Sequence, residues 1–399
     1  MSADSRPIAL LLTPVWPQPG VSGRALRAWD WLQTLSKDYQ VHVLVDQTQM
    51  PDSSFEFPAA HVWPVPIRHV DWGRSRLFRM LGSVIPLLGL FDRRFVLDWA
   101  HWDIEPVLAE LSKQISGRSV QRIVTFRFYL HDAATKVAQT FSRAQFELDM
   151  DDLESSTRAS VSLSLLRMGR YREALRSMLS AIQYAALERW VIGAYQVIWL
   201  ASADDCQALR TKASTQVHCR PNRIPSVPVT KSPSGQALQL LFVGTLNYPP
   251  NEEAVQTLIC GVLPELRLVM RDPWRLCIVG RCASASLIQL LHEKPEVDYV
   301  GDAQNISPWY ESSNIVLVPL RSGGGTKLKT IEAFAHARAL VSTPHGVRGL
   351  GAVKDTHYLE AESPQAFAKA IVQLVQDQAL SERIAMAGWT LINESQGQS

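Results

Sequence analysis

The stretch that decides the fold is Ser322 to Leu350, SGGGTKLKTIEAFAHARALVSTPHGVRGL. It opens with three glycines, continues with residues of helical period, and then passes through the apolar run 339–343 into a second glycine turn. Because glycine has no Cβ, its backbone can approach a ligand closely and can adopt positive φ. The order predicts a glycine loop, a helix that begins at about Thr326, and a buried strand.

The loop and the start of this helix predict a phosphate site. A helix N-terminus directs free N–H groups and the positive end of its dipole toward whatever precedes it, here Gly323, Gly324 and Gly325. Lys327 and Lys329 add positive charge at the same end. These features together favour a bound anion.

A carboxylate one turn farther along completes the pattern. Glu332 is three residues beyond Lys329, so both side chains can face the ligand. Leu328, Ile331 and Ala335 fall at helical spacing on the side expected to pack on the sheet. Glu332 is placed to accept hydrogen bonds from ribose hydroxyls, and phosphate plus ribose indicates a nucleotide.

The stretch resembles the donor-binding segment of retaining glycosyltransferases of family four, a group with the GT-B fold. In that family a Glu, seven residues, Glu motif spans this loop and helix, and the second Glu grips the ribose. Glu332 matches the second Glu, whereas the first falls on Gly324, as in the branch written GGGT, basic residue, Leu, Lys. Ala337 stands where the family usually has Gly.

The resemblance implies two Rossmann-like domains, each a doubly wound parallel sheet, that face each other across a cleft. A chain of 399 residues is long enough for two such domains. We expect an N-terminal acceptor-binding domain over 1–225, a linker over 226–235 rich in Pro, Ser and Gly, and a C-terminal nucleotide-sugar domain over 236–375. Residues 376–399 would form a helix that crosses back to the first domain.

Composition excludes several classes of protein. The content of 46% hydrophobic and 20% charged residues is typical of a folded globular chain, and a net charge of +2 gives no general attraction to nucleic acid. The five cysteines have no CxxC spacing, which disfavours a disulfide framework and a zinc site. No run approaches the roughly 18 apolar residues of a membrane span. We expect a cytoplasmic protein.

Alternating strands and helices are expected throughout. The N-terminal half begins with a strand over 8–15, a helix over 24–36 and a strand over 41–45. In GT-B enzymes the loop between the first strand and helix faces the donor phosphate, which makes Gly23 and Arg24 candidates; a plain tight turn is the alternative.

Residues 64–96 interrupt this alternation. Six arginines surround an apolar stretch in this segment, a composition found in elements that lie on anionic lipid. A helical insertion packed on its own domain explains it equally well. The membrane interpretation would place the protein peripherally on the inner face of the cell membrane and would suit a lipid-linked acceptor.

Two further segments of this half carry charge. The cluster Asp149, Asp151, Asp152 and Glu154 follows a predicted strand; capping of the next helix, ligand binding and a metal site are the alternatives. The GT-B resemblance argues against the metal. Residues 156–191 have helical period without proline, with a basic face that is solvated or lies on lipid. That face comprises Arg167, Arg170, Arg172 and Arg176.

The C-terminal domain departs from the family at one more place. Many relatives have a basic pair just after the first strand, where this chain has Thr245, Leu246 and Asn247. Lys327 and Lys329, with help from Arg281, are expected to supply the charge. The full predicted donor-binding set is Gly23, Arg24, Gly244, Arg281, Gly301, Gly323, Gly324, Gly325, Thr326, Lys327, Lys329, Glu332 and Gly346.

The resemblance predicts an enzyme that moves a sugar, with retention, from a nucleoside-diphosphate sugar to a glycan or a lipid-linked acceptor. No cofactor or metal is expected. Lys329 and Glu332 are the predicted catalytic residues, and His131, which lies near a strand end, is the candidate base, with a core or surface role as its alternative. A GT-B phosphorylase or epimerase is a second hypothesis, and a degenerate GT-B domain that binds a partner transferase is a third.

Overall fold

The computed structural model describes residues 6–19, 22–50, 61–67, 101–210, 215–224, 227–230, 232–233, 237–303 and 305–397. The chain forms two compact units. One contains residues 1–159 and 175–223, and the other contains residues 160–174 and 224–399. Nearly all of the basic segment 64–96 lies outside the described residues, so its prediction is not addressed by the fold.

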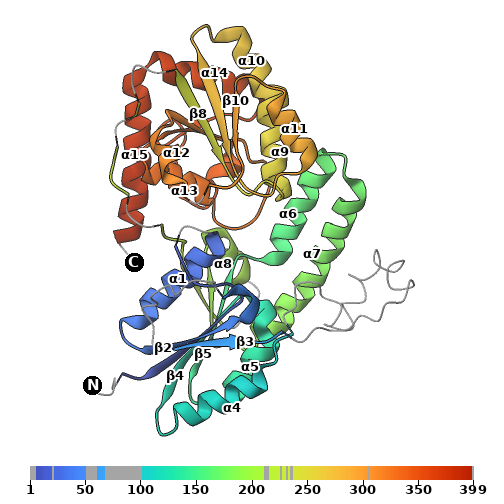
Figure 1. Ribbon diagram of the computed structural model, residues 1–399, viewed down its shortest axis with the longest axis vertical. Helices are drawn as coiled ribbons and strands as arrows, with labels where there is room; N and C mark the ends of the chain where they lie inside the picture. Colours follow the sequence, from blue (N-terminus) through green and yellow to red (C-terminus); the bar gives the residue numbers. More distant parts are fainter. Residues whose placement is uncertain are drawn as a thin grey trace. The chain divides into compact units, whose positions relative to one another are not determined.

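The N-terminal unit is built on a parallel sheet of seven described strands in the order β3-β2-β1-β4-β5-β6-β7 (Figure 1). Its strands are β1 (Ile8–Thr13), β2 (Gln40–Asp46), β3 (His61–Val65), β4 (Val120–Phe126), β5 (Gln145–Asp151), β6 (Val197–Leu200) and β7 (Gln216–Cys219). Its helices are α1 (Gly23–Ser36), α4 (Ile104–Gln114), α5 (His131–Thr140) and α8 (Ala203–Arg210). Short 3-10 turns cover Gln47–Gln49 and Phe128–Leu130.

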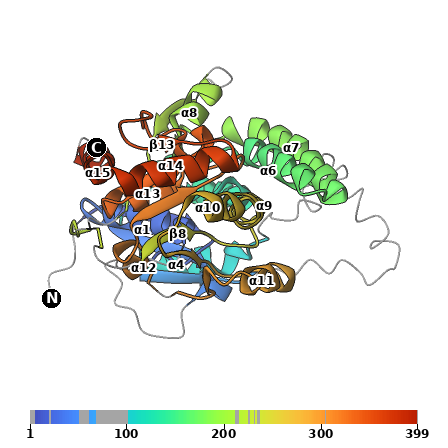
Figure 2. The ribbon, with the colours of Figure 1, turned by 90° about the horizontal axis from the view of Figure 1, so that it is seen from above.

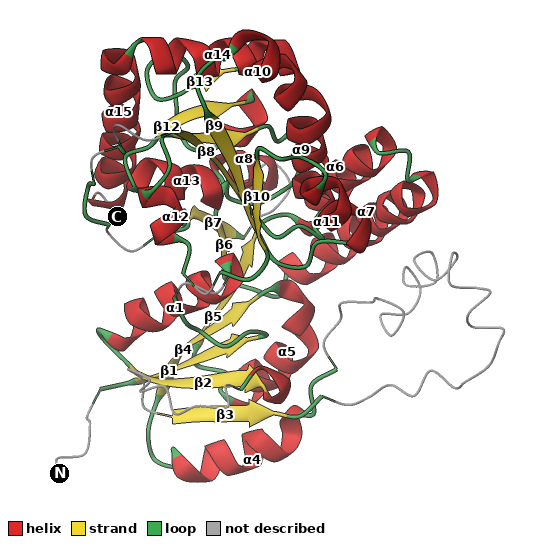
Figure 3. Cartoon of the chain, turned by 45° about the horizontal axis from the view of Figure 1, so that its top comes forward, coloured by secondary structure: helices red, strands yellow, loops and turns green. Residues whose placement is uncertain are grey.

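Helices cover both faces of this sheet because successive side chains of a strand point to opposite sides. On β1, Ile8, Leu10 and Leu12 belong to a core with residues of α4 and α5. Ala9 and Leu11 belong to a second core with residues of α1. Figure 3 shows α1 and α4 on opposite sides of β1 to β5. The sheet is therefore doubly wound, as predicted.

Two long helices, α6 (Glu154–Arg167) and α7 (Tyr171–Ile192), lie side by side as a hairpin (Figures 1 and 2). The sequence predicted one helical stretch over 156–191. The chain turns at Gly169, whose φ of 74° suits glycine, and Arg170 N–H bonds to the Leu165 carbonyl. Residues 160–174, at the turn of the hairpin, belong to the C-terminal unit.

The C-terminal unit has a parallel sheet of six described strands in the order β10-β9-β8-β11-β12-β13. Its strands are β8 (Leu238–Val243), β9 (Trp274–Val279), β10 (Val297–Val300), β11 (Ile315–Val318), β12 (Ala339–Ser342) and β13 (Leu359–Glu360). Its helices are α9 (Pro249–Thr257), α10 (Leu263–Val269), α11 (Ala285–His292), α12 (Ser307–Glu311), α13 (Leu328–Ala335), α14 (Pro364–Gln376) and α15 (Gln378–Gly397). A π-helical turn over Leu258–Val262 joins α9 to α10, and a 3-10 turn covers Pro344–Val347.

Helix α15 is packed within this unit, against α13, β12 and α14. The described residues of the predicted linker are also attached here, because the Arg338 guanidinium donates to the carbonyl and hydroxyl of Thr230. Asn314 donates to Ser232 and to the Pro233 carbonyl. Polar side chains of the C-terminal unit therefore hold the linker that the sequence presented as an exposed connection.

Candidate active site

The candidate site lies at the point where strand order reverses in the C-terminal sheet. β8 and β11 are neighbours there, and ligands of open α/β sheets bind beyond the carboxyl ends of such strands. Gly244 follows β8, and the glycine loop 323–325 follows β11. The backbone at this edge is tightly packed, since a Cβ built on Gly280 would lie 1.9 Å from the Gly244 carbonyl oxygen.

The loop has the conformation that its glycines permit. Gly323 has a φ of 111° and Gly325 a φ of 67°. The Gly323 amide donates to the Ser160 hydroxyl at 2.7 Å, and the Gly324 amide donates to the Tyr248 hydroxyl at 3.3 Å. Hydroxyl oxygens therefore occupy the positions to which these two amides point. An anion with oxygens there would meet the same donors.

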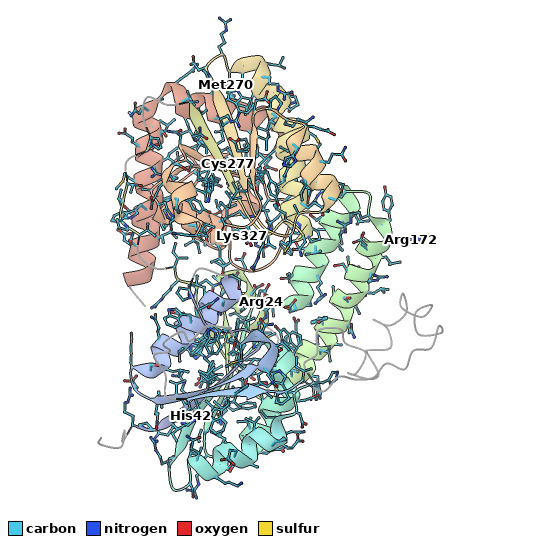
Figure 4. The ribbon with its side chains drawn as sticks, viewed as in Figure 1. Arg24, His42, Arg172, Met270, Cys277 and Lys327 are labelled. Carbon is cyan, nitrogen blue, oxygen red and sulfur yellow. The ribbon has the colours of Figure 1, made fainter. Side chains whose placement is uncertain are left out.

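Lys327 has a different position from the one predicted. Its side chain is buried, and its ammonium donates to the Gly323 carbonyl at 2.9 Å and to the Gly325 carbonyl at 3.2 Å (Figure 4). Lys327 therefore stabilises the loop from within. The first residue of α13 is Leu328, two positions later than predicted, with Lys327 at the N-cap.

Lys329 is the lysine that faces the site. Its ammonium donates to Asn251 Oδ1 at 2.5 Å and lies 4.5 Å from the centre of the Phe242 ring. A Cβ on Gly244 would lie only 3.0 Å from Lys329 Nζ, so the glycine makes room for the ammonium. Burial lowers the pKa of Lys329 to about 7; the carboxylate of Glu332 opposes this shift and Lys327 adds to it.

Glu332, one turn along α13, is held by a tyrosine from α12. The Tyr310 hydroxyl donates to Glu332 Oε2 at 2.8 Å. Burial raises the pKa of Glu332, whereas the Tyr310 hydrogen bond and the charge of Lys329 oppose the rise. Tyr310 is fully buried, and burial with the adjacent carboxylate raises its own pKa well above the usual value. The carboxylate is thus fixed one turn beyond Lys329.

The turn after β12 is tied to the same loop. His345 Nε2 donates to the Gly323 carbonyl at 2.9 Å, and burial, followed by the charge of Lys327, lowers the pKa of His345 to about 4. A Cβ on Gly346 would lie 2.2 Å from Ser342 Oγ, and the Gly346 carbonyl accepts from Thr330 at 2.6 Å. The requirement for glycine at position 346 therefore comes from packing.

Residues at the turn of the α6–α7 hairpin form ion pairs with α9 of the C-terminal unit. The buried carboxylate of Glu253 accepts from Arg167 at 2.5 Å and also from the Ser164 hydroxyl. Arg170 bonds to Glu252 at 2.8 Å. Two of the four arginines predicted to form a solvated or lipid-facing surface are therefore ion-paired within the C-terminal unit.

Two predicted donor residues, Arg281 and Gly301, follow strands β9 and β10 of the same sheet. The Arg281 side chain is exposed. Gly301 is next to Tyr299, whose hydroxyl donates to the Gly280 carbonyl at 3.2 Å and would lie 3.2 Å from a Cβ at position 301. Thr326 lies in the loop itself, where its carbonyl accepts from the Leu328 amide at 2.9 Å.

The candidates of the N-terminal unit stand at the starts of two helices, Gly23 and Arg24 on α1 and His131 on α5. Gly23 begins α1 behind the N-cap Ser22, and Arg24 is half-exposed with its guanidinium 3.8 Å from Glu154. His131 is 4% exposed, and its Nδ1 lies 3.1 Å from the Tyr195 hydroxyl. Trp190 packs edge-on against the His131 ring. A buried imidazole with these partners has a core role, so we do not assign it the role of base.

The acidic cluster after β5 is neutralised by arginines. Asp149 accepts from Arg27 at 2.7 Å and 2.9 Å, and also from the Trp31 indole. Arg127 bonds to Asp152 at 2.7 Å and to Glu154. The cluster is therefore an ion-pair network, which neither the capping nor the metal interpretation anticipated. No group of metal-binding side chains was found among the described residues.

Several site residues escaped the sequence reasoning: Ser160, Tyr248, Asn251, Tyr310 and His345. Asn251 and Tyr248 follow β8, where the sequence lacks the expected basic pair, so a search for polar side chains there would have found them. Ser160 and Tyr310 come from helices distant in sequence and carry no local signal.

Comparison with known proteins agrees with this geometry. Residues 237–377 match the family model described as Glycosyl transferases group 1. This segment is a glycosyltransferase domain. It contains the glycine loop, Lys329 and Glu332, so the prediction of a glycosyltransferase is confirmed for this part of the chain. A search of curated proteins found no match.

Solved structures share the fold over nearly the whole chain. A sucrose-phosphate synthase from Thermosynechococcus elongatus has a TM-score of 0.65 at 15% identity, covering 98% of each chain. Anabaena HepE in complex with UDP and glucose has a TM-score of 0.58 at 12% sequence identity, covering 98% of this chain and 99% of that one. A trehalose-phosphate synthase from Burkholderia xenovorans has a TM-score of 0.59 at 12% sequence identity, covering 97% of this chain and 96% of that one. The predicted GT-B fold with two doubly wound parallel sheets is confirmed.

Proposed function

We propose that this protein transfers a hexose-type unit from a nucleoside-diphosphate sugar, with retention at the anomeric carbon, in polysaccharide or glycoconjugate biosynthesis. The observation that carries the proposal is the convergence of the glycine-loop amides, Lys329 and Glu332 at the switch point of a glycosyltransferase domain. The amides and Lys329 would hold the diphosphate, and Glu332 would accept hydrogen bonds from the ribose hydroxyls.

The chemistry requires stabilisation of the leaving diphosphate. As the bond between the anomeric carbon and the phosphate oxygen breaks, negative charge develops on that oxygen, and the Lys329 ammonium with the loop amides would stabilise it. The acceptor oxygen bonds to the anomeric carbon on the same face, and its proton passes to the leaving phosphate. This route, which the family resemblance implies, requires no side chain as base and is consistent with the core role of His131.

For the acceptor we propose a glycan or a lipid-linked glycan. The support is the resemblance and the basic, apolar composition of residues 64–96, which suits contact with an anionic membrane. None of the described helices is long and apolar enough to cross a bilayer. A cytoplasmic enzyme bound to the inner face of the membrane would fit both features.

Two departures from the family pattern favour an alternative, a degenerate domain that binds a partner transferase. Gly324 stands at the position of the family's first Glu, and Thr245, Leu246 and Asn247 stand where many relatives have a basic pair. Such a domain would bind nucleotides without turnover.

A panel of UDP-, GDP- and ADP-sugars separates these functions through release of nucleoside diphosphate and through sugar transfer. We expect turnover with one donor class, lost in Lys329→Ala and retained in Lys369→Ala, an exposed lysine on α14. Binding without turnover would support the degenerate domain. Absence of both binding and turnover would contradict both functions.

A further inference from the structure

Helix α7 exposes a continuous apolar stripe. Tyr171, Leu175, Met178 and Ile182 recur at spacings of four, three and four, which places them on one face of the helix. Their side chains are 70%, 62%, 39% and 54% exposed, respectively. Of the fourteen large apolar side chains that are exposed in the described residues, seven lie on α6 and α7. Isolated exposed apolar residues are ordinary, but a stripe of four marks an interaction surface.

Arginines accompany the stripe. Arg172 and Arg176 follow Tyr171 and Leu175 by one residue each, so they line one flank, and Arg189 is exposed farther along the helix. Figure 4 labels Arg172 at the end of α7 nearest the turn. Within the described residues no carboxylate lies in ion-pair distance of these three guanidiniums. Arg167 and Arg170, by contrast, are paired with Glu253 and Glu252. The face therefore carries apolar area and uncompensated positive charge together.

We propose that this face of α7 docks on an anionic lipid bilayer. Apolar side chains would enter the boundary between headgroups and acyl chains while the arginines bind lipid phosphates. Trp190, half-exposed on the same helix and held by its contact with the His131 ring, suits the interfacial depth at which indoles gather. The helix would lie on the membrane, because its charged residues prevent it from spanning.

Charge decides between a bilayer and a second copy of this chain. A second copy would present the same arginines, and the exposed acid of α7, Glu173, is already bonded to Arg170 at 2.8 Å. Self-association would bring uncompensated positive charges together, whereas an anionic bilayer supplies the missing negative charge. The stripe and its arginines are all residues of α7, outside the segment 64–96 in the sequence, and the inference does not depend on the donor site.

Cosedimentation of the full-length protein with vesicles tests the proposal. Vesicles of phosphatidylcholine with phosphatidylglycerol are compared with vesicles of phosphatidylcholine alone, at low and high salt. We expect binding to the anionic vesicles, weakened by salt. The double variant Arg172→Gln/Arg176→Gln should weaken the partition roughly 30-fold, about fivefold for each arginine. Leu175→Gln/Ile182→Gln should weaken it at least about tenfold.

Matched variants keep the test specific. Arg143→Gln and Leu268→Gln replace an exposed arginine and an exposed leucine outside α7 and should leave binding unchanged. Every variant should keep the melting temperature of the parent. The proposal is overturned if the protein does not bind to anionic vesicles, or if Arg74→Gln/Arg76→Gln abolishes binding while the α7 variants do not. It is also overturned if the stripe variants convert a dimer to a monomer without affecting vesicles.

Discussion

The Tyr310 hydroxyl donates a hydrogen bond of 2.8 Å to the Glu332 carboxylate, which joins α12 to α13 beside the glycine loop. Tyr310 is fully buried, so its hydroxyl cannot rotate into solvent. The carboxylate therefore has one fixed oxygen, and its other oxygen remains available to the proposed ribose. This arrangement holds the Glu332 carboxylate in one position for the proposed contact with the nucleotide.

Replacement of Glu332 by alanine should weaken donor use without unfolding the protein. Loss of a charge-assisted hydrogen bond costs about 1.5–3 kcal/mol, so kcat/KM for the donor should fall roughly 10- to 150-fold. Tyr310→Phe, which leaves the carboxylate in place, should have a smaller effect. Steady-state kinetics with thermal melting measures both. Full activity of the Glu332→Ala enzyme would show that the ribose does not bind to Glu332.

Replacement of Lys329 by alanine should affect catalysis more than stability. Removal of one preorganised donor from a developing negative charge typically costs about two to three powers of ten in kcat. The half-buried ammonium is also costly to keep charged, since desolvation lowers the pKa of Lys329 to about 7. The variant should therefore melt no lower than the parent. If kcat and donor KM match those of Lys369→Ala, Lys329 does not contact the diphosphate.

The pH dependence follows from the same lysine. The charged form is needed to attract the diphosphate, so kcat/KM should fall as pH rises through about 7, the pKa of Lys329 in the free protein. A bound diphosphate favours the ammonium and raises that pKa, so kcat should hold to higher pH. Lys329→Arg, which stays charged, should flatten the kcat/KM profile. If kcat/KM of the parent stays constant to a pH well above neutrality, the charge of Lys329 is not what attracts the diphosphate.

Ala337 lies just after α13 with a φ of 49°, a region that favours glycine. Ala337→Gly should therefore stabilise the protein by about 1 kcal/mol. Ala333→Gly, in the body of the same helix, should destabilise it by about 1 kcal/mol or more, since glycine disfavours helix interiors. Denaturant unfolding compares the two. A lower stability for Ala337→Gly would show that no strain resides there.

Gly280 and Gly193 form a contrasting pair. A Cβ at position 280 would meet the Gly244 carbonyl at 1.9 Å, whereas nothing lies within 4 Å of a Cβ at position 193. We expect Gly280→Ala to lower stability by about 1–3 kcal/mol and to disturb the site beside Gly244. Gly193→Ala should be close to neutral. Equal melting temperatures for the two variants would show that the edge of the sheet can relax.

Much of the C-terminal unit was predictable because its signals are local. The strands over 238–243 and 297–300 have the predicted limits, since short apolar runs bounded by polar or glycine residues leave little choice. Their spacing placed Lys329 and Glu332 on one helix, and α13 contains both. The family resemblance singled out position 337 as one that usually holds glycine. The positive φ of Ala337 is a physical reason for glycine at that position.

Other features depend on contacts between distant residues. The turn at Gly169 was missed because a single glycine in a helical pattern is often tolerated. Lys327 looked like a phosphate ligand, but the loop carbonyls that bind it become apparent only when the loop is folded. The pair Arg27 and Asp149, 122 residues apart, shows why the acidic cluster could not be interpreted from sequence.

Thermal shift with UDP, GDP and ADP measures diphosphate and ribose binding at the glycine loop, Lys329 and Glu332 without any acceptor. We expect one of the three nucleotides, at about 100 times its Kd, to stabilise the parent by about 2.7 kcal/mol. The shift should be reduced in Lys329→Ala and Glu332→Ala and unchanged in Lys369→Ala. No shift with any nucleotide, or an equal shift in all variants, would show that the glycine loop, Lys329 and Glu332 do not bind a nucleotide.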